Sequence, residues 1–250
     1  MPSEREWLPS GKLGQDLVCK RACGLFLLCT ECFSEITREN RKADRFARLH
    51  PAGVCDRITL PKPVRIGVIL MDMIETQRLL FRKARSEDLL PAWNNIWKDE
   101  ILAKTMLWRP ALTLKEAEER MEKTIAIQSA NFAWFVCLKE TDEPIGFCGA
   151  RETSPGQFED AGLCIARSMQ GQGLGREMLT ALVDFVFAVL GGERFEYGCF
   201  RENAVSAALC KGCGFTYFKC EECTRKWDGH RYLCDFYQLN RKDWAPGKTL

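Results

Sequence analysis

The stretch Gln170-Gly171-Gln172-Gly173-Leu174-Gly175-Arg176 places three glycines within five residues. It follows an expected strand at 160–166 and precedes an expected apolar helix at 177–190. Because glycine has no Cβ, the backbone here can approach a ligand closely and adopt positive φ angles. The start of a helix offers free N–H groups and the positive end of the helix dipole, which favour an anion such as a pyrophosphate. The stretch therefore predicts a phosphate-binding turn.

Two common phosphate-binding motifs do not fit this spacing. The dinucleotide fingerprint reads G-x-G-x-x-G and has an acidic residue roughly 20 positions further on, whereas the glycines here read G-x-G-x-G. A P-loop ends in Gly-Lys-Ser or Gly-Lys-Thr, and this stretch has neither ending. The sequence therefore excludes both motifs, and the turn must belong to another kind of phosphate site.

The elements expected on either side of the turn follow the order β-αα-βββ-α-β-α-ββ. Strands are expected, from apolar and β-branched runs between turn signals, at 76–83, 132–138, 145–151, 160–166, 195–200, 215–224 and 230–239. Helices are expected from residue 86, from the capping box Thr113-Leu114-Lys115-Glu116 to about 127, at 177–190 and at 203–211. This order predicts the α/β class, with a mixed central sheet flanked by helices.

The composition is that of an ordinary globular protein. The chain has 250 residues, 46% of them hydrophobic, and a net charge of +2, so the total charge argues against a nucleic-acid or membrane-surface partner. No apolar run reaches the roughly 18 residues that a membrane helix needs, and none has the form of a signal peptide. We therefore expect a cytoplasmic protein whose 14 cysteines are reduced thiols.

The first 70 residues lack the periodicity of the rest of the chain. Met71 and Met73 stand immediately before the first expected strand, so one interpretation of 1–70 is a translation start placed too far upstream. The other is a functional N-terminal extension. We expect one domain at 71–244 and a short C-terminal tail at 245–250.

Several motifs together resemble the GNAT superfamily of N-acetyltransferases over about 71–244. Gln170 to Gly175 fits Q-x-x-G-x-G, the pyrophosphate loop of that superfamily, and Asn203 to Phe215 resembles its N-x-x-S/A…G-F segment. The stretches Glu75–Arg82 and Arg241–Trp244 look like the RimJ/RimL branch, named for acetyltransferases of ribosomal-protein N-termini. The resemblance implies the GNAT fold, acetyl-CoA as cosubstrate and no metal.

The implied reaction is direct attack of a primary amine on acetyl-CoA. The acceptor stays open among a peptide N-terminus, an aminoglycoside, a polyamine and a small metabolite, because acceptor specificity depends on variable loops. The competing hypothesis is a GNAT-fold module that binds acyl-CoA without catalysis or serves as an interaction domain. We expect a monomer or homodimer.

The resemblance also assigns residues to the cosubstrate. The strand before the turn is expected to bind the pantetheine arm through its backbone, and an N–H near Cys164 or Ile165 to stabilise the oxyanion. The expected cofactor-binding residues are Cys164, Ile165, Gln170, Gly171, Gly173, Leu174, Gly175, Arg176, Asn203 and Ser206. Trp93, Trp97 and Trp108 fall where such enzymes line the acceptor cleft.

Three residues are candidates for the proton chemistry. Asp160 occupies the acidic position of the E-[IL]-G start to its strand and is the first choice of base, although a solvated strand end is an equally open interpretation. Glu152, expected in the loop after the preceding strand, is the second choice. Cys210 stands where many relatives have a Tyr acid; it is either a thiol donor or a packing residue, and solvent could also return the proton.

Two cysteine patterns have the spacing of metal sites. Cys210 and Cys213 with Cys220 and Cys223 form one frame, but strand residues 220 and 223 should point to opposite faces. The pattern Cys19-x3-Cys23-x5-Cys29-x2-Cys32 is the better candidate by spacing alone. We expect neither to hold a metal.

Overall fold

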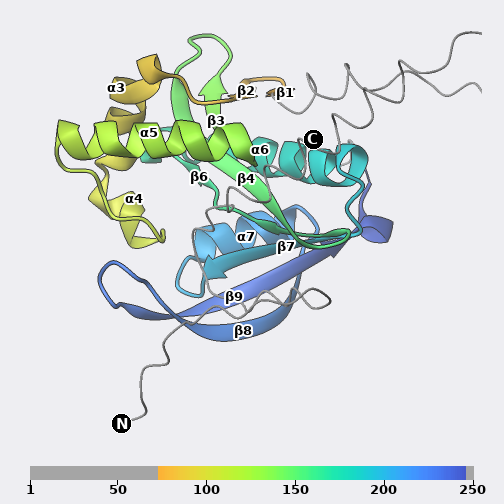
Figure 1. Ribbon diagram of the computed structural model, residues 1–250. Coiled ribbons are helices and arrows are strands. Elements are labelled where there is room, and N and C mark those ends of the chain that lie inside the picture. The colour runs from red at the N-terminus through yellow and green to blue at the C-terminus, as the bar shows by residue number, and fades with distance from the viewer. Residues whose placement is uncertain (1–72, 246–250) are drawn as a thin grey trace, which may run out of the picture. The chain divides into compact units, whose positions relative to one another are not determined.

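A mixed nine-stranded sheet forms the centre of the computed structural model, which describes residues 73–245 (Figure 1). The strands are β1 Met73–Glu75, β2 Leu79–Arg82, β3 Phe132–Leu138, β4 Pro144–Ser154, β5 Gln157–Asp160, β6 Cys164–Ile165, β7 Arg194–Phe200, β8 Thr216–Thr224 and β9 Arg231–Asn240. Their order across the sheet is β1-β2-β3-β4-β5-β7-β9-β8, with β6 paired to β4 beside β5. The pairing of β5 with β7 is parallel and every other pairing is antiparallel. The α/β class and the mixed sheet are therefore confirmed.

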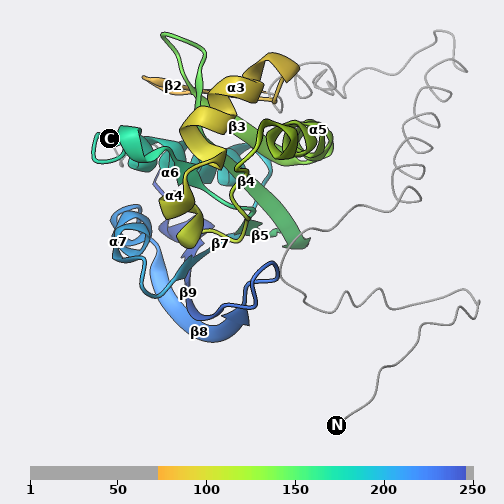
Figure 2. The same ribbon diagram turned by 90° about the vertical axis from the view of Figure 1, so that its left-hand side faces the viewer.

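Helices cover both faces of this sheet. They are α3 Leu89–Ala92, α4 Glu100–Lys104, α5 Leu114–Ala130, α6 Leu174–Asp184 and α7 Ala204–Gly212. Figure 2 shows α6 and α7 on one side of the strands and α5 on the other. The capping box predicted at the start of α5 is present: Thr113 Oγ1 accepts from the Glu116 N–H at 3.3 Å, and the Glu116 carboxylate accepts from the Thr113 N–H at 3.1 Å.

Each face of the sheet has its own apolar core, because side chains alternate along a strand. On β3, Trp134 and Val136 pack with α6, whereas Phe135 and Cys137 pack with the segment that includes α3 and α5. All four side chains are at most 1% exposed. The sheet is thus buried on both faces at its centre, where the strands around the predicted turn lie.

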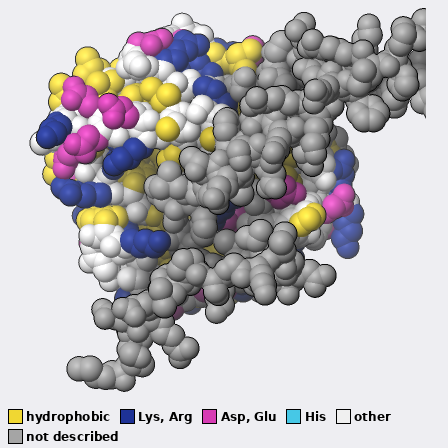
Figure 3. Space-filling view, viewed as in Figure 1, with side chains coloured by type: hydrophobic (Ala, Val, Ile, Leu, Met, Phe, Trp, Pro, Cys, Tyr) yellow, Lys and Arg dark blue, Asp and Glu magenta, His cyan; other side chains and the backbone are white. Residues whose placement is uncertain are grey.

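The outer face of α5 is charged and mixed in sign. Figure 3 shows acidic and basic side chains interspersed over this helix. Lys115, Glu118, Glu119, Glu122 and Lys123 are exposed there. Within residues 73–245, no helix is long and apolar enough to cross a membrane.

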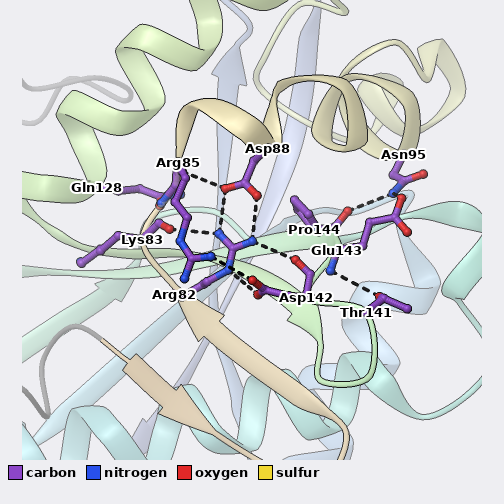
Figure 4. A network of polar contacts seen from close by, with 11 residues as sticks. Arg82, Lys83, Arg85, Asp88, Asn95, Gln128, Thr141, Asp142, Glu143 and Pro144 are labelled. Atoms are coloured by element: carbon purple, nitrogen blue, oxygen red, sulfur yellow. Dashed lines mark hydrogen bonds and ion pairs between the residues drawn. The ribbon is translucent and has the colours of Figure 1, made fainter.

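A buried ion network joins β2 to two other parts of the chain (Figure 4). Arg82 donates from Nη1 and Nη2 to the two oxygens of Asp88, at 2.7 Å each, and from Nε to Asp142 at 2.5 Å. Asp88 lies just before α3, and Asp142 lies in the turn between β3 and β4. Arg82 and Asp88 are both buried. The network therefore fixes the start of the helical segment against the sheet.

Several expected boundaries were wrong. The strand expected at 76–83 is shorter, β2 at Leu79–Arg82, because residues 76–78 form a turn in which the Thr76 N–H donates to the Leu79 carbonyl at 3.0 Å. The strand β1 lies before this turn. The helix expected from residue 86 is divided into a 3₁₀ turn, α3 and a π-helical turn that ends at Trp97. The helix expected at 177–190 begins earlier, with α6 at Leu174, and ends in a π-helical turn at Val189.

The fourth difference bears on function: the expected strand at 160–166 is broken into β5 and β6. Gly162 lies between them with φ of 107°, which interrupts an extended ladder. The expected N-terminal extension, 1–70, and the last five residues of the chain lie outside the described residues.

Candidate functional site

The glycine-rich turn leads directly into the uncapped start of α6. Gly173 is the N-cap residue of α6 and has φ of 80°, in the left-handed region, and no side chain caps the helix. Gly171 has φ of 77°. Residues with a Cβ rarely adopt such angles, so the turn requires glycine at both positions. The N–H groups of the first turn of α6 have no partner within the helix and are available to an anion.

The turn is tied to the strand before it. Gln170 donates from Nε2 to the Ile165 carbonyl at 2.8 Å, so the side chain predicted to open the motif anchors the turn on β6. Leu174 is buried beneath the start of α6. These contacts bring together the predicted residues of the turn and those of the strand, Cys164 and Ile165.

The sheet divides immediately before this turn. β5 pairs with β7 from Gln157–Arg194 to Glu159–Glu196, and that ladder ends there. Beyond it, β6 stays on β4, while β7 stays on β9 as far as Phe200. Within residues 73–245, β6 therefore has β4 as its only partner. The other backbone edge of β6 has no strand paired to it, because the ladder between β5 and β7 has already ended.

Asp160 lies at this fork, and its carboxylate bridges the two sides. Oδ2 accepts from the Gly198 N–H of β7 at 2.8 Å, and Oδ1 accepts from the Gly162 N–H at 3.1 Å. Burial raises the pKa of Asp160 to about 6, against the two backbone hydrogen bonds, which lower it. The carboxylate is therefore hydrogen-bonded to the backbone on both sides of the fork.

Glu152 does not lie in a loop, as the sequence had suggested. β4 continues to Ser154, and Glu152 lies on it opposite Phe158 of β5. Its exposed carboxylate accepts from the Gly156 N–H at 3.0 Å, which closes the turn between β4 and β5. The loop prediction failed because the length of β4 depends on its pairing with β5, which residues 145–151 alone do not reveal.

Of the remaining predicted residues, Gly175 and Arg176 lie in the first turn of α6, and the others belong to α7 and its N-cap. Asn203 caps it, with Oδ1 accepting from the Ser206 N–H at 3.1 Å. The Cys210 side chain is fully buried and donates to the Ala207 carbonyl at 3.3 Å, and burial raises the pKa of its thiol to about 12.

Sequence reasoning did not select Tyr197 of β7, although it contacts the predicted residue Ser206. Its hydroxyl lies 2.8 Å from Ser206 Oγ, and burial raises its pKa above the ordinary value. The strict alternation of β7, which buries Phe195, Tyr197 and Cys199 on one face, was the signal that could have identified it.

The predicted tryptophans pack the helical segment beside α5. Trp97 is 3% exposed and lies against Phe135, with ring centroids 5.9 Å apart. Trp93 donates from Nε1 to the Ala111 carbonyl at 2.8 Å. Arg120 of α5 lies over the rings of Trp97 and Trp108. Trp97 is therefore a core residue in this structure.

The cysteine frame on α7 and β8 does not form a cluster. Cys213 is buried near Thr180, while Cys220 and Cys223 lie half-buried along β8. Among the described residues, no group of three or more His, Cys, Asp or Glu side chains could hold a metal ion. The frame at Cys19 to Cys32 lies outside the described residues.

An open polar pocket of about 510 Å³ lies beside the turn. It is lined by Asn94, Asn95, Asp99, Arg167, Ser168 and Gln170. Asp99 caps α4 and forms an ion pair with Arg167 at 3.3 Å. The segment that precedes α4 therefore reaches the chain between β6 and the glycine-rich turn.

A family model and several known proteins are similar to this chain. Residues 78–216 match the family model described as the acetyltransferase (GNAT) domain. An uncharacterized N-acetyltransferase p20 of Bacillus licheniformis is 28% identical over 149 residues, which are 58% of this chain and 83% of that protein.

Two solved structures from Vibrio cholerae show the same fold. A putative ribosomal-protein-serine acetyltransferase is 25% identical, with a TM-score of 0.59 over 67% of this chain and 97% of that one. A spermidine N-acetyltransferase, solved in complex with CoA and spermine, is 19% identical, with a TM-score of 0.56 over 67% of this chain and 98% of that one.

Proposed function

This chain belongs to the GNAT acetyltransferase family and is an N-acetyltransferase, and we propose that it uses acetyl-CoA bound at the turn around Gly171 and Gly173. The observation that carries the proposal is the uncapped start of α6 at a left-handed glycine, next to the edge of β6 that β7 leaves free. Free N–H groups and a helix dipole suit the pyrophosphate. Homologues of the family bind CoA, as the spermidine N-acetyltransferase complex illustrates.

The free edge of β6 supports a path for the pantetheine arm. The Ala166 N–H donates to the Ile145 carbonyl of β4 at 2.6 Å. Because successive N–H groups of a strand point to opposite edges, the Ile165 N–H points away from β4. We assign this N–H as the donor to the pantetheine arm or to the oxyanion. Of the two predicted residues, Cys164 and Ile165, the proposed donor is therefore Ile165.

Asp160 is the proposed general base. With a pKa raised to about 6, it is mostly ionised at pH 7 yet close enough to neutrality to accept a proton efficiently. It takes a proton from the acceptor ammonium, directly or through water, and the free amine attacks the thioester carbonyl. The carbon–sulfur bond then breaks and the CoA thiolate takes a proton.

The Cys210 thiol is a poor candidate for the acid that protonates the CoA thiolate. That thiol is fully buried, donates to a helix carbonyl and has a pKa raised to about 12, so we propose that it packs α7. The remaining donors are solvent and Ser206, whose Oγ lies 2.8 Å from Tyr197 Oη. Glu152 is the second candidate for the base.

The proposed acceptor is a primary amine, either a peptide N-terminus or a small-molecule amine. Release of CoA thiol, measured with peptides beginning in Ser or Ala, with polyamines and with aminoglycosides, would identify the class. Acetyl-CoA binding without thiol release on any amine would favour the competing hypothesis of a non-catalytic CoA-binding module.

The cosubstrate site is tested by Gly173→Val, with Gly191→Val as the matched control. Both glycines have positive φ, 80° and 71°, so valine is strained at each, but Gly191 lies beyond α6 and away from the turn. We expect Gly173→Val to weaken acetyl-CoA binding in calorimetry, and Gly191→Val to lower only stability. Equal affinity in a folded Gly173→Val protein would place the site elsewhere.

A further inference from the structure

Arg78 connects the turn between β1 and β2 to the glycine-rich turn. Its Nη1 donates to the Gln172 carbonyl at 2.9 Å, and its Nε donates to Glu177 Oε2 at 2.8 Å. Its backbone N–H donates to Glu177 Oε1, also at 2.8 Å. One side chain therefore contacts both the glycine-rich turn and the first turn of α6, which lie more than 90 residues away in sequence.

Glu177 is a buried carboxylate in the first turn of α6. Its side chain is 6% exposed, and Thr76 Oγ1 also donates to Oε1, at 2.5 Å. Burial alone would raise the pKa of Glu177, but the hydrogen bonds from Thr76 and Arg78 outweigh it and hold the pKa below its ordinary value. The group is therefore ionised at neutral pH.

An ionised Glu177 would oppose a second anion at the same helix start. The dipole gives the N-terminal end of α6 only about half a positive charge, and the ionised carboxylate already lies in its first turn. The guanidinium of Arg78 neutralises this charge through the ion pair at Nε. With Arg78 in place, the start of α6 keeps its attraction for a phosphate group.

The contact with Gln172 also orients an N–H of the turn. In a trans peptide the carbonyl of one residue and the N–H of the next point in opposite directions. Because the Gln172 carbonyl points to Arg78, the Gly173 N–H points away from it. The same guanidinium Nη2 lies 3.5 Å from where a Cβ on Gly173 would be, so Arg78 sits directly against the residue that begins α6.

We propose that Arg78 is a positioning residue for the pyrophosphate of acetyl-CoA: it orients the Gln172–Gly173 peptide and neutralises Glu177. This inference rests on the proposed function, namely that the turn binds acetyl-CoA. Arg78 lies outside the glycine-rich motif. Removing its charge should weaken acetyl-CoA binding, and removing the charge of Glu177 as well should restore part of that binding.

The test uses Arg78→Gln, Glu177→Gln and the double variant in the full chain. We expect Arg78→Gln to weaken acetyl-CoA binding roughly tenfold, the size of a charge effect at a partly exposed helix end. The KM for acetyl-CoA should rise while kcat changes little. Adding Glu177→Gln to Arg78→Gln should restore affinity several-fold, because the uncompensated charge is gone and the amide oxygen can still accept from Thr76.

The control is Arg85→Gln, which removes an arginine of similar exposure whose side chain pairs with Asp142, away from the turn. It should leave the Kd unchanged. With 3′-dephospho-CoA the loss in Arg78→Gln should be as large as with acetyl-CoA, because the pyrophosphate remains.

Three results would overturn the inference. One is an unchanged Kd in Arg78→Gln, and another is a double variant that is folded but binds more weakly than Arg78→Gln alone. The third is a loss that disappears with 3′-dephospho-CoA, which would move Arg78 to the 3′-phosphate. If the wild-type protein itself did not bind acetyl-CoA, the proposed function would fail, and the inference with it.

Discussion

Replacing Asp160 by Asn should make the protein more stable at neutral pH while it removes the proposed base. Burial raises the pKa of this carboxyl from its ordinary 3.8 to about 6. At roughly 1.4 kcal/mol per pKa unit, the ionised form costs about 3 kcal/mol of folding free energy. An Asn has one acceptor oxygen, so one of the bonds to Gly162 and Gly198 is lost, at about 1 kcal/mol. The net gain above pH 7 is then about 2 kcal/mol.

The sign of the pH dependence follows from the direction of this pKa change. Below pH 3.8 the carboxyl is protonated in the folded and unfolded states, so its burial costs the wild-type protein no charge-related stability. As the pH rises through about 6, the free energy of unfolding of the wild-type protein falls, because the unfolded chain ionises first. The stability of Asp160→Asn relative to wild type should therefore increase between about pH 4 and pH 6 and stay constant above it.

Two assays measure the two consequences. Urea unfolding of both proteins at several pH values gives the difference in free energy of unfolding. Steady-state kinetics should show kcat/KM lowered by about 10²–10⁴-fold, with the limb near pH 6 missing from the pH profile. A difference in stability that does not change with pH would refute the buried-carboxyl argument. A near-native kcat/KM would move the base to Glu152 or to water.

Two further substitutions test other parts of the structure. Arg82→Met leaves Asp88 buried without its partner and should lower the free energy of unfolding by about 3–5 kcal/mol, whereas Arg85→Gln, which breaks an exposed pair with Asp142, should cost less than about 1 kcal/mol in the same urea titration. Equal losses in the free energy of unfolding would mean that the buried pair is worth no more than the exposed one. Cys210→Ala should cost about 1 kcal/mol of stability and leave kcat/KM close to wild type, because we propose that the buried thiol only packs α7. A loss of activity as severe as that of Asp160→Asn would instead make the thiol the acid.

Local patterns in the sequence were sufficient for several elements of the fold. The glycine spacing from Gly171 to Gly175 predicted a turn before a helix, and the structure has α6 begin there. The capping box at Thr113 predicted the start of α5, where the structure has it. These signals succeed because caps and tight turns depend on hydrogen bonds and φ angles within a few residues.

Contacts between distant segments could only be seen in the tertiary structure. The break between β5 and β6 depends on which neighbours each strand pairs with, and Glu152 lies on β4 because β5 extends that ladder. Arg78 and Glu177 are 99 residues apart in sequence, and each reads as a solvated charge until the sheet brings them together. The raised pKa of Asp160 likewise depends on burial beside the Gly198 N–H of β7. Pairing partners and burial are properties of the whole fold, so the local sequence determined the glycine-rich turn, and the tertiary structure decided which charges and carboxyls surround it.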